Sequence, residues 1–468
     1  MSTSTSAGAD ARRALLALLA RATFHPTADQ RWRALVVGHD AWLDEQLDPA
    51  GIDDTDAEAA LAGFPWIGRT AAELRTSYGG GGWALSEQSK AARIVRAVRS
   101  ERQLLERVVD LWNDFFNVPF TAQDANYLRP PHEENVIRAR ALGTFPELLR
   151  AVARSPAMGA FLDQDSSDRD APNENWAREL LELYTLGEGS GYTENDVREV
   201  ARCFTGWGYV RHWEPGTFGV FRFDAGRHDD GEKTVLGRAI PAGGGVQDGE
   251  RVLDLLLLDP RTRARVARAI VRWFLGEDAL ESTDAPARVE AVYAATGGSI
   301  LAMVRECLSQ ESLTQARAWE RPMLKRPFHF AVSLLRATGA RLTSPTTAVY
   351  AFEGLGQVPF EWPEPDGFPL DPAAWSGGLA PRWRLASQLL SGWTSWADVD
   401  VQDLEDLVGG APEAAWARAL SEALVPGGLR PHELRAVDRF ARFGPGSRAD
   451  RLVGATELVA SSASFQLV

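Results

Sequence analysis

The sequence predicts a mainly α-helical, multi-helical globular protein with one small β-hairpin insertion near residues 218–237. Three observations support this fold class. Apolar residues recur at three- and four-residue steps over most of the chain, which is the spacing of amphipathic helices. Helix-capping patterns separate these stretches. Apolar and polar residues alternate most clearly around a single Asp-Gly pair, which is typical of a hairpin.

The clearest helix of the N-terminal part follows the run Gly79 to Gly82. Ser86 can cap this helix, and apolar residues continue at helical spacing as far as Trp112. The opposite face of the helix is charged, and we expect it to be solvated; it carries Arg93, Arg96, Arg99, Arg102 and Glu106.

Three later helix starts have recognisable caps. Thr144 and Glu147 have the spacing of a capping box, with Pro146 between them in the first turn. A helix is predicted to start near Asn173, and another at Thr193. The predicted hairpin follows, with His228, Asp229 and Asp230 at its tip, and helical periodicity resumes over residues 250–335.

Composition restricts the function classes. The chain of 468 residues carries 50 Lys and Arg against 64 Asp and Glu, a formal net charge of −14, so we expect no nucleic-acid partner. No apolar run approaches the length of a membrane span. Two cysteines, far apart in the sequence, can form one disulfide at most, which is too few to stabilise a chain of this length. The apolar run after Arg12 is too short for an export signal. We therefore expect a cytoplasmic protein.

The domain organisation is predicted to be a single helical unit over residues 1–468. A subdivision into N-terminal helices (1–130), a central core (131–345) and a C-terminal loop with helices (346–468) is compatible with the pattern. Residues 357–382 are rich in Pro, Trp and Gly and predict a long irregular segment. Long loops inside compact domains are often functional.

The helix that starts near Asn173 carries an acidic stripe. At about 100° per residue, one arc contains Glu174, Asn175, Arg178, Glu179 and Glu182. One interpretation is an ordinary solvated helix face, stabilised by ion pairs between residues four positions apart. The other is a polar stripe facing a cavity, in which Glu179 or Glu182 acts as a general acid or base and Arg178 orients a carboxylate or an anionic group.

Two further groups are candidates. His228 and Asp229, with Lys233 close behind, can be a base with its orienting carboxylate, but His-Asp-Asp-Gly is equally good turn chemistry. Trp375 and Arg382, in the irregular segment, can line an opening that stacks a sugar or an aromatic ligand, or the aromatic residues can only hold the loop in place.

The stretch NENWARELLELYTLGEGSGYTENDVREVARCFTGWGY at 173–209 resembles the signature of the domain of unknown function 1800 family. Further segments that match the family are LLARATFHPT near the start, ALGTFPELLRAVARSPAM at 141–158, FRFDAGRHDDGEKTVLG and LGQVPFEWPEPDGFP. The resemblance covers most of the chain. It implies a predominantly helical fold and no settled activity.

This chain departs from the family pattern at four histidines. The pattern has Trp-His-Asn-His-Phe where this chain has Asn113 and Phe115 within Trp-Asn-Asp-Phe-Phe, and it has histidines at the positions of Ser155 and Tyr184. His228 remains at a family histidine position. Any metal or proton chemistry that depends on the lost imidazoles is therefore not expected, and we predict no bound metal.

The functional hypothesis is an enzyme that processes a small molecule or a saccharide, in a biosynthetic setting, with an acidic pocket between residues 173–185 and 218–237. Glu179, Glu182, His228 and Asp229 would be its catalytic groups. Ligand-binding groups would be Glu174, Asn175, Arg178, Tyr184, Lys233, Trp375 and Arg382. The alternative is a noncatalytic binding or scaffold protein, with a protein partner, derived from a metal-dependent family. No motif identifies a cofactor.

Overall fold

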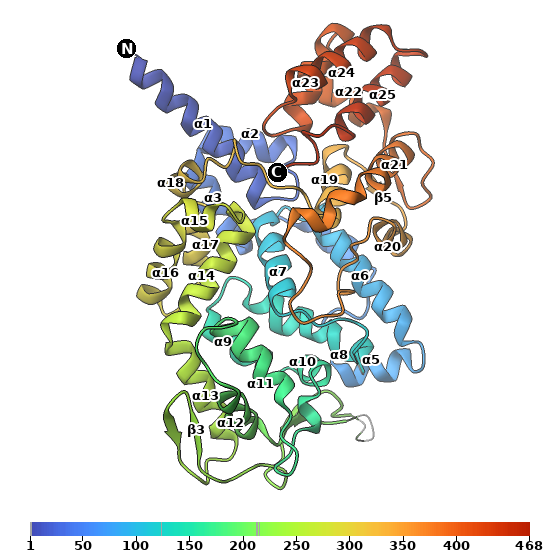
Figure 1. Cartoon of the computed structure of the whole chain (residues 1–468). Coiled ribbons are helices and arrows are strands. Elements are labelled where there is room, and N and C mark those ends of the chain that lie inside the picture. Colours follow the sequence, from blue (N-terminus) through green and yellow to red (C-terminus); the bar gives the residue numbers. More distant parts are fainter. Residues whose placement is uncertain (1, 123, 212–213, 215) are drawn as a thin grey trace.

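The computed structural model describes residues 2–122, 124–211, 214 and 216–468, and it is mainly helical, with small antiparallel hairpins (Figure 1). The N-terminal helices are α1 Ser2–Ala22, α2 Ala28–Val37, α3 His39–Leu47, α4 Thr55–Leu61, α5 Ala71–Tyr78, α6 Gly82–Arg99, α7 Gln103–Phe115 and α8 Ala125–His132. The central helices are α9 Phe145–Ala153, α10 Pro156–Phe161, α11 Glu174–Glu179, α12 Glu194–Phe204, α13 Val246–Leu258, α14 Pro260–Leu275, α15 Ala279–Ser282, α16 Ala285–Thr296, α17 Ile300–Cys307, α18 Gln310–Gln315 and α19 Pro327–Ala337.

The C-terminal helices are α20 Pro345–Glu353, α21 Leu379–Leu390, α22 Val401–Val408, α23 Glu413–Leu424, α24 Pro431–Phe443 and α25 Arg448–Ala460. The 3₁₀ turns are η1 Pro49–Gly51, η3 Arg138–Arg140, η4 Gln164–Ser166 and η6 Pro372–Gly378, and the π-helical segments are η2 Glu133–Ile137 and η5 Leu180–Thr185. The strands are β1 Trp207–Tyr209, β2 Phe221–Phe223, β3 Lys233–Val235, β4 Arg238–Ile240, β5 Arg341–Leu342 and β6 Ala397–Asp398. Within the described residues, no helix has both the length and the apolar character needed to cross a bilayer.

The predicted helix caps are confirmed where the signal is local. Thr144 accepts a hydrogen bond from the backbone N–H of Glu147 at the start of α9, and Asn173 accepts one from Asn175 at the start of α11. Thr193 and Asp196 form a full capping box on α12. Each cap satisfies backbone N–H groups that the first helical turn leaves free.

The long helix predicted from Ser86 to Trp112 is two helices. Helix α6 begins at Gly82, so Ser86 lies inside it and donates to the carbonyl of Trp83, 2.7 Å away. The chain breaks after Arg99, where the Asp54 carboxylate accepts from the Ser100 hydroxyl and from a backbone N–H. Gln103 donates to carbonyls at the end of α6. These side chains replace the backbone bonds that a continuous helix would make.

Antiparallel strand pairing is present in the predicted region, but it forms two hairpins. Strand β2 pairs with β1, and β3 pairs with β4. The tight turn falls at Leu236 and Gly237, which both have positive φ, and the N–H of Leu236 donates to the Asp196 carboxylate. His228 and Asp229 therefore lie in the connection between the hairpins and not at a tip.

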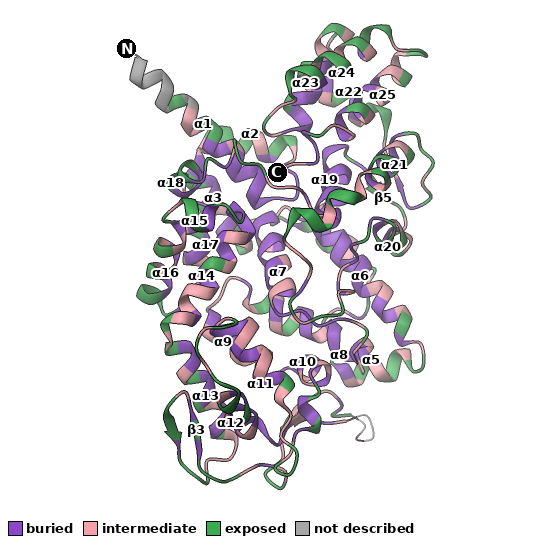
Figure 2. Cartoon of the chain, viewed as in Figure 1, coloured by how far each residue is buried: buried purple, intermediate pink, exposed green. Residues whose placement is uncertain are grey.

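Two hydrophobic clusters form the interior, and helix α6 contributes to both. The first cluster combines α1, α3 and α7 with the central helices, and the second combines α19 to α25 with one face of α6. Buried residues consequently run along α6 and α7 in the middle of the molecule (Figure 2).

The expectation that the charged face of α6 and α7 is solvated is wrong. Arg93 and Glu106 are each only 2% exposed, and Arg96 is also buried; Arg99 and Arg102 remain partly exposed. Arg93 binds Glu106 at 2.7 Å, and Arg138 binds the other Glu106 oxygen at 2.7 Å. Periodicity identified the polar face correctly, but helix packing covered that face with partners of opposite charge.

This buried ionic network reaches beyond the two helices. Asp110 on α7 accepts Arg93 at 3.1 Å, and Arg107 and Arg326 lie within 3.7 Å of its carboxylate. Burial raises the pKa of Glu106, but the charges of Arg138 and then Arg93 lower it by more, to about 2. The network thus joins α6, α7, the segment after α8 and the chain before α19.

We predict that Glu106→Gln lowers the free energy of unfolding by about 3–5 kcal/mol, because it leaves two arginines without their full charge partner in the interior. The control, Asp398→Asn, removes an exposed pair with Arg341 and should cost less than about 1 kcal/mol. Urea unfolding at neutral pH measures both values, and equal effects would contradict a buried network.

The same substitution has a predicted pH dependence. A carboxyl whose pKa is lowered on folding stabilises the fold fully above its ordinary value of 4.5 and loses that contribution as the pH falls towards about 2. The stability difference between the wild type and Glu106→Gln should therefore shrink between pH 5 and pH 2. Unfolding curves across this range test the sign.

Candidate functional site

The acidic stripe of α11 lies at the surface, and its side chains form ion pairs with one another and with α12. Arg178 binds Glu174 at 3.3 Å, Glu182 at 3.5 Å and Glu194 on α12 at 2.8 Å. The Asn175 side chain is exposed. Pairs at four-residue spacing contribute about 0.2–0.5 kcal/mol each. The contacts of Glu174, Arg178 and Glu182 are those of a stabilised helix surface.

Glu179 differs from its neighbours because it is partly buried. Burial raises its pKa, the charge of Glu182 raises it further, and Arg178 opposes both. Asp366 and Glu364, from the irregular segment, also raise the pKa of Glu179. A second acidic segment therefore comes close to this side of α11.

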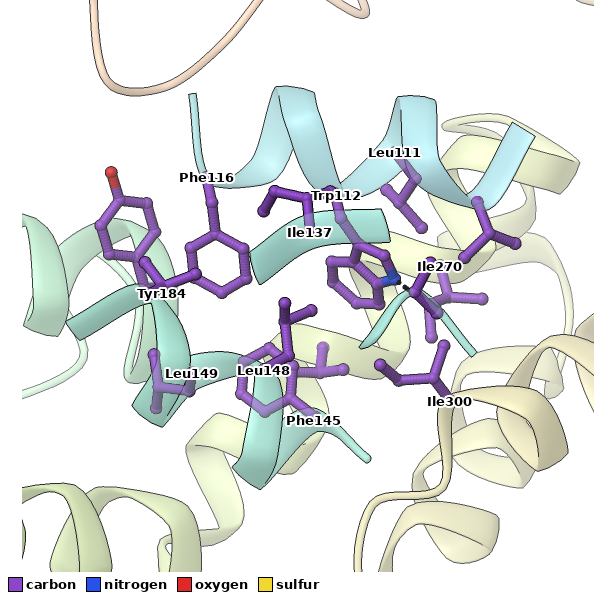
Figure 3. Close-up of a cluster of buried hydrophobic side chains, with 14 of the residues drawn as sticks. Leu111, Trp112, Phe116, Ile137, Phe145, Leu148, Leu149, Tyr184, Ile270 and Ile300 are labelled. Atoms are coloured by element: carbon purple, nitrogen blue, oxygen red, sulfur yellow. Dashed lines mark hydrogen bonds between the residues drawn. The ribbon is translucent and has the colours of Figure 1, made fainter. Parts of the chain in front are cut away.

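Tyr184 lies in the hydrophobic interior, on the π-helical segment η5. Its ring packs beside Phe116, with 5.0 Å between the ring centroids (Figure 3). The ring centroid of Phe115 lies 6.2 Å away. The hydroxyl lies 3.9 Å from the Sδ atom of Met158, and burial raises the pKa of the phenol. Tyr184 is therefore a packing residue with a weak hydrogen bond, and it is not exposed to a ligand.

The residues at the four family histidine positions have different contacts and do not bond to one common group. Phe115 and Tyr184 contact each other, whereas the Ser155 hydroxyl lies 2.7 Å from Nδ1 of His132. Asn113 accepts a hydrogen bond from Arg129 and donates to the Val109 carbonyl. Among the described residues, no three His, Cys, Asp or Glu side chains come together in a way that could hold a metal ion.

His228 and Lys233 share a buried carboxylate that the sequence did not reveal. Asp248 at the start of α13 is 0% exposed, and its Oδ2 lies 2.7 Å from the Lys233 Nζ and 3.3 Å from the His228 Nε2. The His228 Nδ1 donates to the carbonyl of Thr205 at 2.8 Å. The partner of His228 is thus Asp248, twenty residues further on, and only the docking of α13 brings the two together.

Asp229 points away from His228 and binds Arg202 at 2.7 Å. The hydrogen bond and charge of Arg202 lower the pKa of Asp229. Its carboxylate also accepts the N–H of Gly231, which is turn chemistry. His228, Asp229 and Lys233 therefore hold the two hairpins against α12 and α13.

Trp375 and Arg382 have structural partners. The Trp375 indole donates to the Pro369 carbonyl at 2.8 Å, and its ring lies 6.2 Å from that of Phe368. Arg382 is 1% exposed, donates to Gln466 and lies over the Phe330 ring. The aromatic residues hold the irregular segment in place, and Arg382 connects α21 to the C-terminal segment.

Two adjoining cavities lie between α7, α14 and the irregular segment. The first, which we call the Arg265 cavity, has a volume of about 500 Å³ and includes Asp114, Phe115, Arg265 and Phe368 in its lining. The second, the Arg326 cavity, has a volume of about 320 Å³. Both cavities are lined by Arg272, Trp273, Glu277 and Leu370. Neither cavity is lined by a residue of 218–237.

Arginines dominate the charged lining of both cavities. The acidic lining residues are Asp114, Glu277, Asp278 and Asp366, and the basic ones are Arg107, Arg261, Arg265, Arg268, Arg272, Arg321 and Arg326. Four of these arginines share one face of α14, because their spacing follows the helical repeat. Arginines therefore outnumber carboxylates in the lining of the two cavities, although the chain has a net charge of −14.

Asp114 is the carboxyl at this site whose environment is most unusual. Burial has the largest effect and raises its pKa, the charge of Arg326 lowers it, and the charge of Asp110 raises it. The resulting pKa is about 6. Arg326 also binds the carboxylate directly. The irregular segment crosses the backbone of Asp114 closely: a Cβ on Gly367 would lie 2.3 Å from the Asp114 carbonyl oxygen, and Gly367 has a φ of +75°. Only glycine fits there.

Arg265 is positioned by the π-helical end of the signature helix. In η5 the N–H groups of Leu186 and Gly187 both bond to Leu181, which leaves the Leu183 carbonyl available. That carbonyl accepts the Arg265 Nε at 2.6 Å. π-helical turns are frequent at functional sites, and here one aims a guanidinium at a cavity. Burial and then Arg272 lower the pKa of Arg265, which stays charged.

Comparison with known proteins identifies the family. The model of the family described as protein of unknown function (DUF1800) matches residues 17–467. No curated protein and no solved structure matches the chain. The chain therefore belongs to the DUF1800 family, as its signature stretch predicted.

We predict that Asp248→Asn lowers the free energy of unfolding by about 3–5 kcal/mol, because it leaves Lys233 and His228 buried without a charged partner. Asp254→Asn on the same helix removes an exposed pair with Arg150 and should cost less than about 1 kcal/mol. Thermal and urea unfolding compare the two. A small loss for Asp248→Asn would argue against a structural role for this network.

Proposed function

We propose that this member of the DUF1800 family is an enzyme that processes a small anionic molecule, including acidic sugar derivatives, in the Arg265 cavity. The observation that carries the proposal is Asp114, a partly buried carboxyl at the cavity wall with a pKa of about 6. At neutral pH such a group is mostly ionised, yet it is basic enough to accept a proton from a bound substrate. Asp114 is the proposed general base.

Arg265 is the proposed anion-binding residue. It lines the cavity, and it donates a hydrogen bond to the neutral carbonyl of Leu183, so its charge is available to a ligand. A guanidinium binds carboxylate or phosphate groups with paired N–H donors. Phe115, Trp273 and Phe368 supply apolar walls for the remainder of the molecule.

The acidic helix α11 contributes the edge of this proposed site. Leu186 and Gly187, which follow the helix, line the cavity, as does Asp366. Asp366 raises the pKa of Glu179, so their charges are close enough to interact. Glu179 and Glu182 are thus proposed to repel anions at the edge and to direct them towards the arginines.

A noncatalytic binding protein is the second candidate. Phe115 and Tyr184 occupy family histidine positions and pack against each other, and Asp114 is held by Arg326. A protein that retains the anion-binding arginines but no longer turns a ligand over would have this arrangement. Binding without turnover distinguishes it from an enzyme.

We predict that Asp114→Asn lowers kcat at least about 100-fold, because it removes the general base, and leaves substrate affinity within a few-fold. The measurement is mass-spectrometric turnover of a panel of phosphorylated and carboxylated small molecules. The wild-type kcat/KM should rise through a midpoint near pH 6. Asp254→Asn, on the exposed side of α13, is the activity control. Unchanged turnover in Asp114→Asn would exclude the assigned role.

The same variant should be more stable than the wild type at alkaline pH. A carboxyl whose pKa is raised on folding supports the fold fully below its ordinary value of 3.8 and loses that support as the pH rises through about 6. A neutral amide removes this cost, so Asp114→Asn should gain about 2–3 kcal/mol above pH 7 and nothing below pH 4. Urea unfolding at both pH values provides the comparison.

A further inference from the structure

We propose that the ligand of this protein is an elongated molecule with an anionic group at each end, one bound by Arg265 and the other by Arg321. This inference rests on the proposed function and specifies its substrate class. The two cavities would act as the two halves of one binding site, with Trp273 along the middle of the ligand.

The two cavities share one wall. Trp273 and Leu370 line both of them, and so do Arg272 and Glu277. Trp273 is held in place by two guanidinium groups, since Arg326 lies 4.4 Å and Arg107 lies 5.4 Å from its ring centroid. The shared wall therefore has an apolar, fixed surface, which suits the uncharged middle of a ligand.

Charge pairing singles out one arginine in each half. The other five arginines have carboxylate partners: Asp259 for Arg261, Glu281 for Arg268, Glu277 for Arg272, Asp110 for Arg107, and Asp110 with Asp114 for Arg326. Arg265 donates to the Leu183 carbonyl, and Arg321 donates to the Ser282 hydroxyl at 3.1 Å. Within the described part of the chain, no carboxylate lies at ion-pairing distance from either.

The two unneutralised guanidinium groups favour a ligand with two negative charges. Each guanidinium without a carboxylate partner attracts an anion, and both lie in a chain whose net charge is −14. A single anion would neutralise only one of the two arginines. A ligand with an anionic group in each cavity neutralises both.

Helix geometry gives a length scale for this ligand. Arg265 and Arg272 are seven residues apart on α14, which corresponds to about 10 Å along the helix axis. Arg272 borders both cavities, whereas Arg265 lines only one and Arg321 only the other. We therefore choose probes whose anionic groups are separated by lengths below and above about 10 Å.

Calorimetric titration of the full chain tests this proposal. The probes are linear α,ω-dicarboxylates of increasing length, the corresponding α,ω-bisphosphates, and monocarboxylates matched in length. We expect the longer dianions to bind at least about tenfold more tightly than the matched monoanions, whichever acid group they carry. Short dianions, which cannot reach both arginines, should bind like monoanions.

Three variants separate the outcomes. Arg265→Gln and Arg321→Gln should each reduce dianion affinity to that of the monoanion, and Arg435→Gln, on an exposed turn of α24, should change nothing. Thermal unfolding confirms that each variant is folded. If Arg265→Gln weakens binding but Arg321→Gln does not, or if dianions and monoanions bind equally, the two-ended ligand is wrong and the proposed function stands. If no probe binds, or if Arg265→Gln leaves binding unchanged, both proposals fail.

Discussion

The buried ionic network around α7 is the constraint on which the site depends. Glu106 and Asp110 face the interior side by side on α7, and arginines from α6, from the segment after α8 and from the chain before α19 converge on them. A buried charge without its partner is costly, so each ion pair fixes the position of the element that supplies it. Helix α7 is consequently fixed in rotation and depth between the two hydrophobic clusters.

The position of α7 determines what faces the cavities. Asp114 follows Asp110 by one helical turn and binds the same Arg326, so the network ends at the cavity wall. Asp110, one turn earlier, has three arginines near its carboxylate. Asp114 has only Arg326, so burial outweighs this one charge and raises the pKa of Asp114 to about 6. One row of acidic residues thus supplies both a structural anchor and a titratable group.

Local features were predictable from the sequence, and partner identity was not. The caps at Asn173 and Thr193 depend on residues within one turn, so they could be recognised directly. The charged face of α6 was correctly identified as polar, but periodicity does not say whether water or other side chains cover it. His228 was predicted to pair with Asp229, but the carboxylate that it contacts is Asp248, from helix α13.

One contact at the cavity involves a departure from regular structure that no sequence pattern marked. The stretch from Leu180 to Thr185 reads as ordinary helix, yet its π-helical turn displaces the backbone bonds and frees the Leu183 carbonyl to accept Arg265. Tyr184, on the same turn, faces inward against Phe116 and anchors it. The Leu183 carbonyl lies in the last turn of this helix, where backbone carbonyls lack intrahelical partners, and Arg265 from α14 supplies one. At this turn the signature helix meets α14 through its backbone, and its partly exposed carboxylates bind elsewhere.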